Sequence, residues 1–449
     1  MLTASGSSCG FTRRIFPDTM RPVNDRGVER TILVALHRPV LSRDVVEEHL
    51  DELERLVETA GGVVVERFVQ ERDRPDPATL VGSGFAHRVA DSCRDLEVQT
   101  VVFDEDLTAS QARNLERELP EDVKVLDRAA VILDIFALRA RSRESQTQVE
   151  LAQLSYLLPR LTRRWRHLSR QAGGIGTRGV GETQLEIDRR LIGRRIAQLR
   201  AQLGGIERDR RLRRRRRQEL PTAALVGYTN AGKSSIFRRL THARVLVEDR
   251  LFATLDPRAR RVMLGDGVTA VLVDTVGFIR KLPHDLVAPF RSTLEEATEA
   301  DVVLHVVDAS HPAWPDHLSV GEDVLADLGV ESERTVVVMN KIDQLPAGAA
   351  VVPPHGRRAV LTSAVSGEGL DELRSTLREA ILEGPDVTFV RVPLERSEEV
   401  RRAVGLPHQI ARRFHHDAVE VAAVVDERRL ADLGLAEFRV GEWGSDGGM

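Results

Sequence analysis

The sequence predicts an α/β protein, because short β-rich runs alternate with helical patterns in two separate regions of the chain. The first region begins near residue 30, and the second spans residues 223–384. A long Arg-rich helical segment separates them, and a short mixed tail follows them. A chain of 449 residues is also too long for one hydrophobic core, so we expect about three compact units.

The first region has the pattern of a small α/β domain with a largely parallel sheet. Its predicted strands are Thr31–Leu36, Val63–Val69, Val98–Phe103 and Val123–Leu126. The helical patterns between them cover Arg43–Ala60, Phe85–Leu96 and Ser110–Leu119. We therefore assign residues 29–138 to this domain and residues 1–28 to a disordered leader, which has no apolar stretch typical of a secretory signal.

An Arg-rich helical hairpin, or arm, is predicted next, over residues 139–220. Helical stretches at roughly 140–170 and 182–218 flank the glycine-dense segment GGIGTRGVGE at 173–182. Residues 139–217 hold 22 arginines, no lysine and 7 acidic residues, a local charge of +15 within a chain of net charge −4. A solvated helical face is the usual explanation of a charge run, but so large an excess favours contact with the phosphates of RNA.

The second region, assigned to residues 221–384, begins with a strand that runs directly into a phosphate-binding motif. The strand Ala223–Val226 is followed by GYTNAGKS and then by a helical pattern, which matches G-x-x-x-x-G-K-[ST] in its required setting. Backbone N–H groups of such a loop surround a β-phosphate, and the helix directs its positive end at it. Lys233 is expected to neutralise the β- and γ-phosphates, and the Ser234 hydroxyl to ligate Mg²⁺.

Three further motifs at strand ends indicate that the nucleotide is a guanine nucleotide. A buried strand ends in DTVG, where Asp274 is placed to hold Mg²⁺ through water and the Gly277 amide to sense the γ-phosphate. Another strand ends in NKID, where the Asp343 carboxylate accepts from guanine N1 and N2 and the stem of Lys341 covers the base. The segment 362–364, Thr-Ser-Ala, is expected to present N–H groups to guanine O6. The carboxyl ends of strands are where ligands bind in an open α/β sheet.

Thr254, in LFATLDP between the first two motifs, is predicted to complete the Mg²⁺ shell when a γ-phosphate is present, which makes residues 244–260 a nucleotide-dependent switch. We take Lys233, Thr254 and Gly277 as the candidate catalytic residues. The expected nucleotide contacts are Gly227, Tyr228, Thr229, Asn230, Ala231, Gly232, Lys233, Ser234, Ser235, Phe252, Ala253, Thr254, Leu255, Asp256, Asp274, Thr275, Val276, Gly277, Asn340, Lys341, Ile342, Asp343, Thr362, Ser363 and Ala364.

The residue after DTVG is Phe278, where Ras-like enzymes place a glutamine that orients water. A phenyl ring cannot hydrogen-bond the nucleophile, so we expect hydrolysis to be slow without a partner, another loop or an ion. Asn230 resembles the residue that binds K⁺ in cation-dependent GTPases, and an equally good interpretation is that it only shapes the loop.

The remaining composition indicates a soluble cytoplasmic protein. Hydrophobic residues make up 42% and charged residues 30%, and no apolar run approaches the roughly 20 residues that cross a bilayer. Only Cys9 and Cys93 are present, too few for a disulfide framework, which favours a reducing compartment. We expect a monomer. Residues 385–449 are assigned to a small α+β domain, with strands Val387–Val392 and Ala418–Val425 and a helix at 396–404.

The segments GYTNAGKSS, LFATLDP, DTVGFIRKLPHDLV, FRSTLEE and GGIGTRGVGETQLEIDRR together closely resemble the HflX family of ribosome-associated GTPases, over about residues 30–384. The resemblance implies that the N-terminal domain and arm dock on the large ribosomal subunit and that GTP drives dissociation of stalled or idle ribosomes. It also implies that the loop of the arm reaches toward the peptidyl-transferase region, with RNA contacts at Gly173, Gly174, Gly176, Arg178, Gly179 and Gly181.

The sequence departs from the family pattern at three places. Val180 replaces a usual proline, Arg258-Ala259 replace a usual pair of threonines, and Pro289 is atypical. These changes affect switch and loop details more than nucleotide binding. An alternative function is an RNA-binding assembly factor or signalling GTPase that does not split ribosomes.

Overall fold

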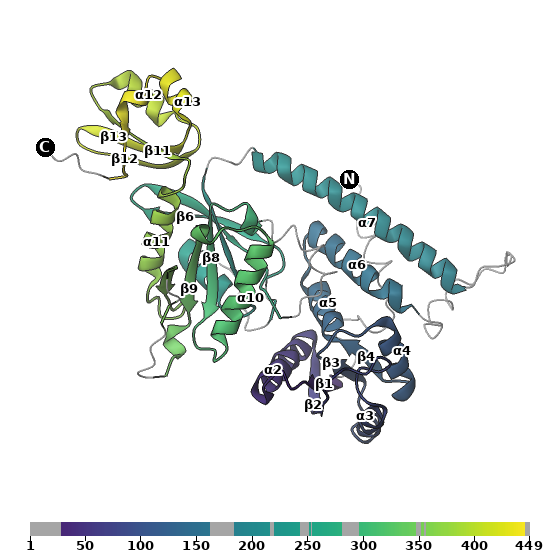
Figure 1. The fold of residues 1–449 in the computed structure, drawn as a ribbon. Coiled ribbons are helices and arrows are strands. Elements are labelled where there is room, and N and C mark those ends of the chain that lie inside the picture. Colours follow the sequence, from purple (N-terminus) through teal and green to yellow (C-terminus); the bar gives the residue numbers. More distant parts are fainter. Residues whose placement is uncertain are drawn as a thin grey trace. The chain divides into compact units, whose positions relative to one another are not determined.

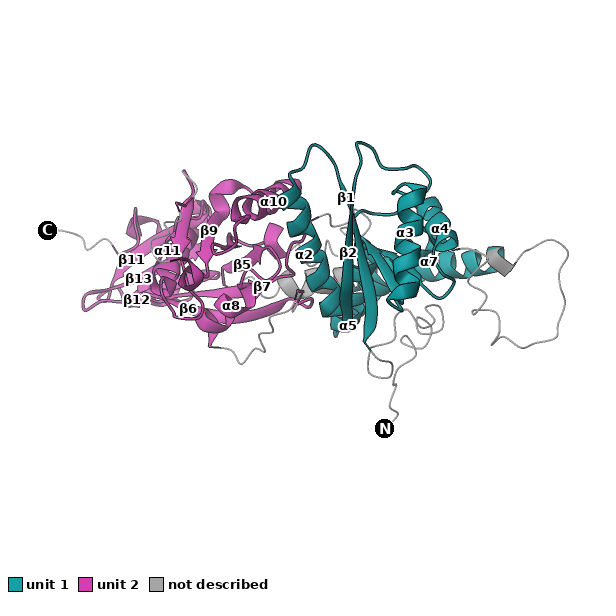
Figure 2. Cartoon of the chain, turned by 90° about the horizontal axis from the view of Figure 1, so that it is seen from below, with its two compact units in different colours: residues 1–206, 282–290 teal, residues 207–281, 291–449 magenta. Residues whose placement is uncertain are grey.

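The chain forms two compact units (Figure 2), one of Met1–Ile206 with Leu282–Phe290 and the other of Glu207–Lys281 with Arg291–Met449. The structure is a computed structural model, and it describes residues 28–161, 184–215, 220–242, 251–252, 254–280, 296–346, 352–353 and 356–444. The boundary between the units falls inside a long helix of the predicted arm.

The first unit contains a four-stranded parallel sheet of order β2-β1-β3-β4. Its strands are β1 (Glu29–His37), β2 (Gly62–Glu71), β3 (Thr100–Phe103) and β4 (Lys124–Asp127), joined by the helices α2 (Arg43–Ala60), α3 (Ser83–Asp95) and α4 (Ala109–Glu118). The helix starts follow from local sequence: Ser42 caps α2, and Thr108 with Gln111 forms a capping box at α4. All four predicted strands and three predicted helices are confirmed.

Three further helices follow this sheet. The apolar helix α5 (Arg128–Arg139), which was not predicted as a separate helix at the end of the first domain, precedes α6 (Arg143–Leu157) and α7 (Gln184–Arg215). The helices α6 and α7 lie side by side (Figure 1), with a shared buried cluster that includes Leu154 and Ile196 and an ion pair between Arg195 and Glu150 at 2.7 Å. The helix α6 ends at Leu157 and is followed by the 3-10 turn Leu158–Arg160. It is thus shorter than the helical stretch predicted at roughly 140–170, of which residues 162–170 lie outside the described part.

The second unit is organised around a sheet whose central strands are parallel, in the order β10-β9-β8-β5-β7. These are β5 (Thr222–Gly227), β7 (Val268–Asp274), β8 (Val302–Asp308), β9 (Thr335–Asn340) and β10 (Arg358–Leu361), and the antiparallel β6 (Arg258–Gly265) pairs with β7. Helices α8 (Lys233–Thr241) and α11 (Leu370–Leu382) pack on one buried face, and α10 (Trp314–Asp327) contributes to a separate cluster.

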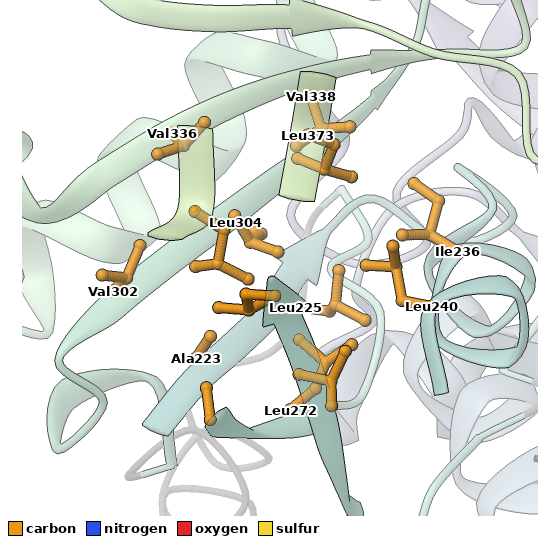
Figure 3. Close-up of a cluster of buried hydrophobic side chains, with 14 of the residues drawn as sticks. Ala223, Leu225, Ile236, Leu240, Leu272, Val302, Leu304, Val336, Val338 and Leu373 are labelled. Carbon is orange, nitrogen blue, oxygen red and sulfur yellow. The ribbon is translucent and has the colours of Figure 1, made fainter. Parts of the chain in front are cut away.

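The core under α8 and α11 consists of alternate strand residues, as Figure 3 shows. Leu225, Leu272 and Leu304 come from three neighbouring strands and meet Ile236 of α8. Because successive strand residues point to opposite faces, the intervening residues Val307, Val337 and Met339 lie in the separate cluster with α10.

The C-terminal strands continue the same sheet beyond β7, in the order β12-β13-β11-β14. The strands β11 (Val387–Pro393) and β13 (Ala418–Val424) and the helix α12 (Ser397–Val404) lie where the sequence predicts them. The additional elements are β12 (Gln409–Phe414), α13 (Glu427–Asp432) and β14 (Arg439–Val440).

The β6–β7 hairpin tip makes the connection to β12. Ala411 pairs with Val268, and Asp266 forms ion pairs with Arg378 of α11 at 3.1 Å and with Arg413 of β12 at 3.0 Å. Gly267 has φ +77°, and a Cβ there would lie 2.2 Å from the Arg412 carbonyl oxygen.

We expect Gly267→Ala to destabilise the protein more than Gly329→Ala does. Both glycines have a left-handed backbone, at φ +77° and +75°, so each substitution costs about 1 kcal/mol of strain. Only the Gly267 substitution also forces a side chain against the Arg412 backbone, which adds about 1 to 3 kcal/mol. Chemical denaturation measures the two free energies of unfolding, and equal losses would contradict the close packing of this hairpin against β12.

Candidate nucleotide site

The phosphate-binding loop connects the end of β5 at Gly227 to the start of α8 at Lys233. Gly227 and Gly232 have φ +133° and +95°, and a Cβ on Gly227 would lie 2.1 Å from the Val306 carbonyl oxygen. Asn230 also adopts a positive φ, of 61°. Local sequence explains the loop shape, since glycine and asparagine tolerate this region best.

The Lys233 ammonium lies inside this loop. Its Nζ donates to the carbonyl oxygens of Gly227 and Tyr228 at 2.9 and 2.8 Å, and the residue is 6% exposed. Burial lowers the pKa of Lys233 to about 8, although the carboxylate of Asp274 opposes the shift. The ammonium is thus placed to exchange two carbonyl oxygens for phosphate oxygens.

The three predicted metal ligands come together, although they derive from three separate segments. Ser234 Oγ lies 2.7 Å from Asp274 Oδ2 and 2.9 Å from Thr254 Oγ1, and Thr254 donates to the same carboxylate oxygen at 3.2 Å. Asp274 is fully buried, and its Oδ1 has no hydrogen-bond partner among the described residues. Burial raises the pKa of Asp274, and the hydrogen bond from Ser234 lowers it. Two hydroxyls and a carboxylate with an unpaired oxygen form the kind of donor set that Mg²⁺ takes.

Asn340, at the end of β9, ties the phosphate end of the site to the guanine end. Its Nδ2 donates to the Ala231 carbonyl oxygen at 2.9 Å, and its Oδ1 accepts from the Ala364 amide at 3.1 Å and from the Thr362 hydroxyl at 3.3 Å. Because β9 and β10 are parallel neighbours, residues 340–343 and 362–364 leave the sheet side by side.

Two carboxylates organise the predicted guanine end. Asp343 Oδ1 accepts from the Ser363 hydroxyl at 2.5 Å, and the Ile342 amide donates to the Thr362 carbonyl oxygen at 3.2 Å. Lys341 has φ +67°, and its Nζ lies 2.7 Å from Asp308 Oδ2. Asp308 was not among the residues predicted from the sequence, although it ends the apolar strand β8 just as Asp274 ends β7.

The DTVG loop pairs with the phosphate-binding loop through its backbone. Phe278 N donates to Gly227 O at 2.9 Å, and Phe278 O accepts from Thr229 N at 2.7 Å. The Phe278 side chain is only 5% exposed, and Arg280 N donates to the Tyr228 hydroxyl at 3.0 Å. The Tyr228 ring stacks on His317 of α10 with centroids 4.0 Å apart, a contact that sequence spacing could not indicate.

The other predicted site residues lie on the same segments. Thr275 is held by a hydrogen bond to the Leu225 carbonyl oxygen at 2.7 Å. The rest are found in α8, after β7 or around Thr254, and are Ser235, Val276, Phe252, Leu255 and Asp256. Ala253 and all six predicted RNA contacts, Gly173, Gly174, Gly176, Arg178, Gly179 and Gly181, lie outside the described residues, as do Val180 and Pro289.

Three family models match consecutive parts of the chain. The GTP-binding GTPase N-terminal model matches residues 47–137, the GTP-binding GTPase middle region matches 139–217, and the 50S ribosome-binding GTPase model matches 222–341. The chain is 44% identical over 408 residues to the GTPase HflX of Lacrimispora saccharolytica, covering 90% of this chain and 95% of that protein.

The chain belongs to the HflX family of GTPases.

Two further HflX proteins show the same similarity. The Magnetococcus marinus protein is 48% identical over 357 residues, with 79% of this chain and 82% of that protein covered. The Escherichia coli protein is 44% identical over 358 residues, with 79% and 83% covered. HflX membership confirms the resemblance found in the sequence, the α/β fold with a P-loop GTPase domain and the assignment to GTP-binding enzymes. Among the described helices, none is long and apolar enough to span a membrane.

We expect guanine-nucleotide affinity to fall between pH 8 and 9, by up to about tenfold per pH unit. The pKa of Lys233 is about 8 in the free protein, and phosphate favours the ammonium form, so above pH 8 binding must take up a proton. Titration with a fluorescent GDP measures the profile. The Lys233→Arg variant keeps its charge at all these pH values and should give a flat, weaker profile; the same slope in this variant would contradict the assignment.

Proposed function

We propose that this HflX GTPase binds the large ribosomal subunit in the cytoplasm as a monomer and uses GTP to dissociate stalled or idle ribosomes. The observation that carries the proposal is the match of the GTPase domain to a 50S ribosome-binding GTPase model, joined to the matching N-terminal and middle regions. The charge of the arm supports it, because 22 arginines against 7 acidic residues give a surface suited to ribosomal RNA.

Several arginines in the described part of the arm lie away from its packed face. Ile192, Ile196 and Leu199 of α7 are buried against α6, at the spacing of one helical face. On the same helix the exposed arginines include Arg189, Arg194 and Arg200. This division leaves basic side chains accessible to RNA phosphates while the apolar face holds the hairpin together.

The nucleotide is proposed to bind across the strand ends. Lys233 meets the β- and γ-phosphates, and Asp343 accepts from the guanine ring while the stem of Lys341 covers it. Ser234 and Thr254 ligate Mg²⁺ directly and Asp274 through water, which agrees with the mutual distances of 2.7 to 3.2 Å between their oxygens. Mg²⁺ supplies charge neutralisation between the β- and γ-phosphates.

Hydrolysis is proposed to be slow in the isolated protein and stimulated by the ribosome. The buried Phe278 side chain, 5% exposed, offers no hydrogen bond to water. Asn230 remains open as a K⁺ ligand or as a residue that shapes the loop. The two roles differ in one observable, since only the first makes hydrolysis faster when K⁺ replaces Na⁺.

The decisive test is ribosome splitting. We expect the protein with GTP to lower the light scattering of 70S ribosomes and to cosediment with large subunits, whereas Lys233→Ala does neither because its phosphate contacts are lost. A non-hydrolysable GTP analogue separates binding from turnover. Stable binding without any splitting, with GTP or the analogue, would instead support the alternative of an RNA-binding assembly or signalling GTPase.

The role of the arm can be tested in the same assay with a control variant of equal charge. Replacing Arg189, Arg194 and Arg200 with glutamine should weaken large-subunit binding and flatten its salt dependence, because each lost phosphate contact lowers the slope by about 1. Replacing the exposed Arg401, Arg428 and Arg429 removes the same charge far along the chain and should leave binding unchanged. Equal losses of binding in the two triple variants would show that the arm contributes only general positive charge.

Guanine selectivity should depend on Asp343. We expect Asp343→Asn to weaken GDP binding by about 100-fold or more, because an amide cannot accept from both guanine N1 and N2. The same variant should gain affinity for xanthosine diphosphate, whose base carries a carbonyl in place of the amino group. Asp371→Asn, at a side chain that is 95% exposed, is the control, and calorimetry that finds unchanged GDP affinity in Asp343→Asn would refute this role.

A further inference from the structure

Thr229 carries a hydroxyl that the described structure leaves unsatisfied. The residue occupies the third position of the phosphate-binding loop and is 6% exposed. Its Oγ1 is buried and has no hydrogen-bond partner among the described residues. An unsatisfied buried hydroxyl costs about 1 to 3 kcal/mol, so such a group calls for an explanation, and an unbound ligand is one.

The surroundings of Thr229 place this side chain at the γ-phosphate end of the site. A Cβ added to Gly277 would lie 2.9 Å from both Thr229 Cα and Cγ2, and 3.0 Å from Lys233 Nζ. Thr229 therefore packs directly against the glycine whose amide is proposed to sense the γ-phosphate. The Lys233 ammonium, proposed to neutralise the γ-phosphate, lies beside the same glycine.

The backbone fixes Thr229 in this position. Its amide donates to Phe278 O at 2.7 Å, and Phe278 N donates back to Gly227 O at 2.9 Å. The two loops thus form a short parallel pairing, which includes a bridge between Tyr228 and Phe278. Phe278 supplies only backbone groups here, whereas the hydroxyl of Thr229 can both donate and accept a hydrogen bond.

We propose that Thr229 Oγ1 orients the attacking water during GTP hydrolysis, accepting a hydrogen bond from the water and donating its own to a γ-phosphate oxygen. The water oxygen forms a bond to the γ-phosphorus as the bond from that phosphorus to the β–γ bridging oxygen breaks. The electron pair leaves with GDP, and the proton of the water passes to the released phosphate. This assignment rests on the GTPase activity of the site and supplies the hydrogen-bonding group that a phenyl ring at position 278 lacks.

The test compares Thr229→Val, which keeps the shape of the side chain without the hydroxyl, with Thr229→Ser, which keeps the hydroxyl. Single-turnover hydrolysis with excess protein, with and without large ribosomal subunits, gives the rate of the chemical step. We expect the valine variant to be slower by about 10- to 100-fold and the serine variant to recover most of the rate. GDP affinity should change less than the rate, because GDP lacks the γ-phosphate that the hydroxyl is proposed to contact.

Two further measurements separate this role from a structural one. Valine removes an unsatisfied buried polar atom, so the thermal stability of the nucleotide-free Thr229→Val protein should stay equal or rise. Thr241→Val is the matched control, because the Thr241 hydroxyl donates to the Phe237 carbonyl oxygen at the far end of α8 and should not affect the rate.

A valine variant that hydrolyses GTP at the wild-type rate would overturn the proposal, and so would an equal loss in the serine variant. The wild-type protein in the same assay distinguishes failure of the Thr229 role from failure of the GTPase function. If the wild type binds GDP but never hydrolyses GTP, even with large subunits, it is the GTPase function itself that fails.

Discussion

The nucleotide site depends on the burial of two opposite charges at one edge of the sheet. Lys233 is 6% exposed and Asp274 is fully buried, and charges removed from water are costly unless each is hydrogen-bonded. Lys233 donates to two loop carbonyl oxygens, one of them that of Gly227, and Asp274 accepts from the hydroxyls of Ser234 and Thr254. The hydrogen bonds of this one pair of charges therefore hold together the phosphate-binding loop, the first turn of α8 and Thr254.

The sequence was sufficient wherever local chemistry decides the structure. The strands of both α/β regions, the loop from Gly227 to Lys233 and the place of Asp274 follow from strand patterns, glycine positions and the rule that ligands bind at strand ends. Ser234 followed from the phosphate-binding motif, and Thr254 from its position between two motifs. Contacts between distant segments were not predictable in the same way. The stacking of Tyr228 on His317 depends on where α10 packs, and α5 lacks the polar face by which a helix is recognised.

The C-terminal strands also show where sequence reasoning stops. A single strand can be predicted from its own residues, but its pairing partner cannot. The strand β12 pairs with β7 only because the β6–β7 hairpin presents Val268 near its tip. The same hairpin follows Thr254 in the chain and ends in Asp274, two of the predicted metal ligands. Its other end is held by the ion pairs of Asp266 with Arg378 and Arg413. The C-terminal strands are therefore part of the frame that holds Asp274.

The pairing of the two phosphate-side loops explains why position 278 can hold a phenyl ring. Its N–H and C=O bind Gly227 and Thr229, and neither bond involves the side chain, so an apolar residue can fill the buried space beside the loop. The consequence is a separation of tasks, in which position 278 fixes the DTVG loop by its backbone and any orientation of water must come from another group. A hydroxyl in the phosphate-binding loop satisfies that requirement without movement of the DTVG loop, because the same backbone pairing holds Thr229 beside Gly277.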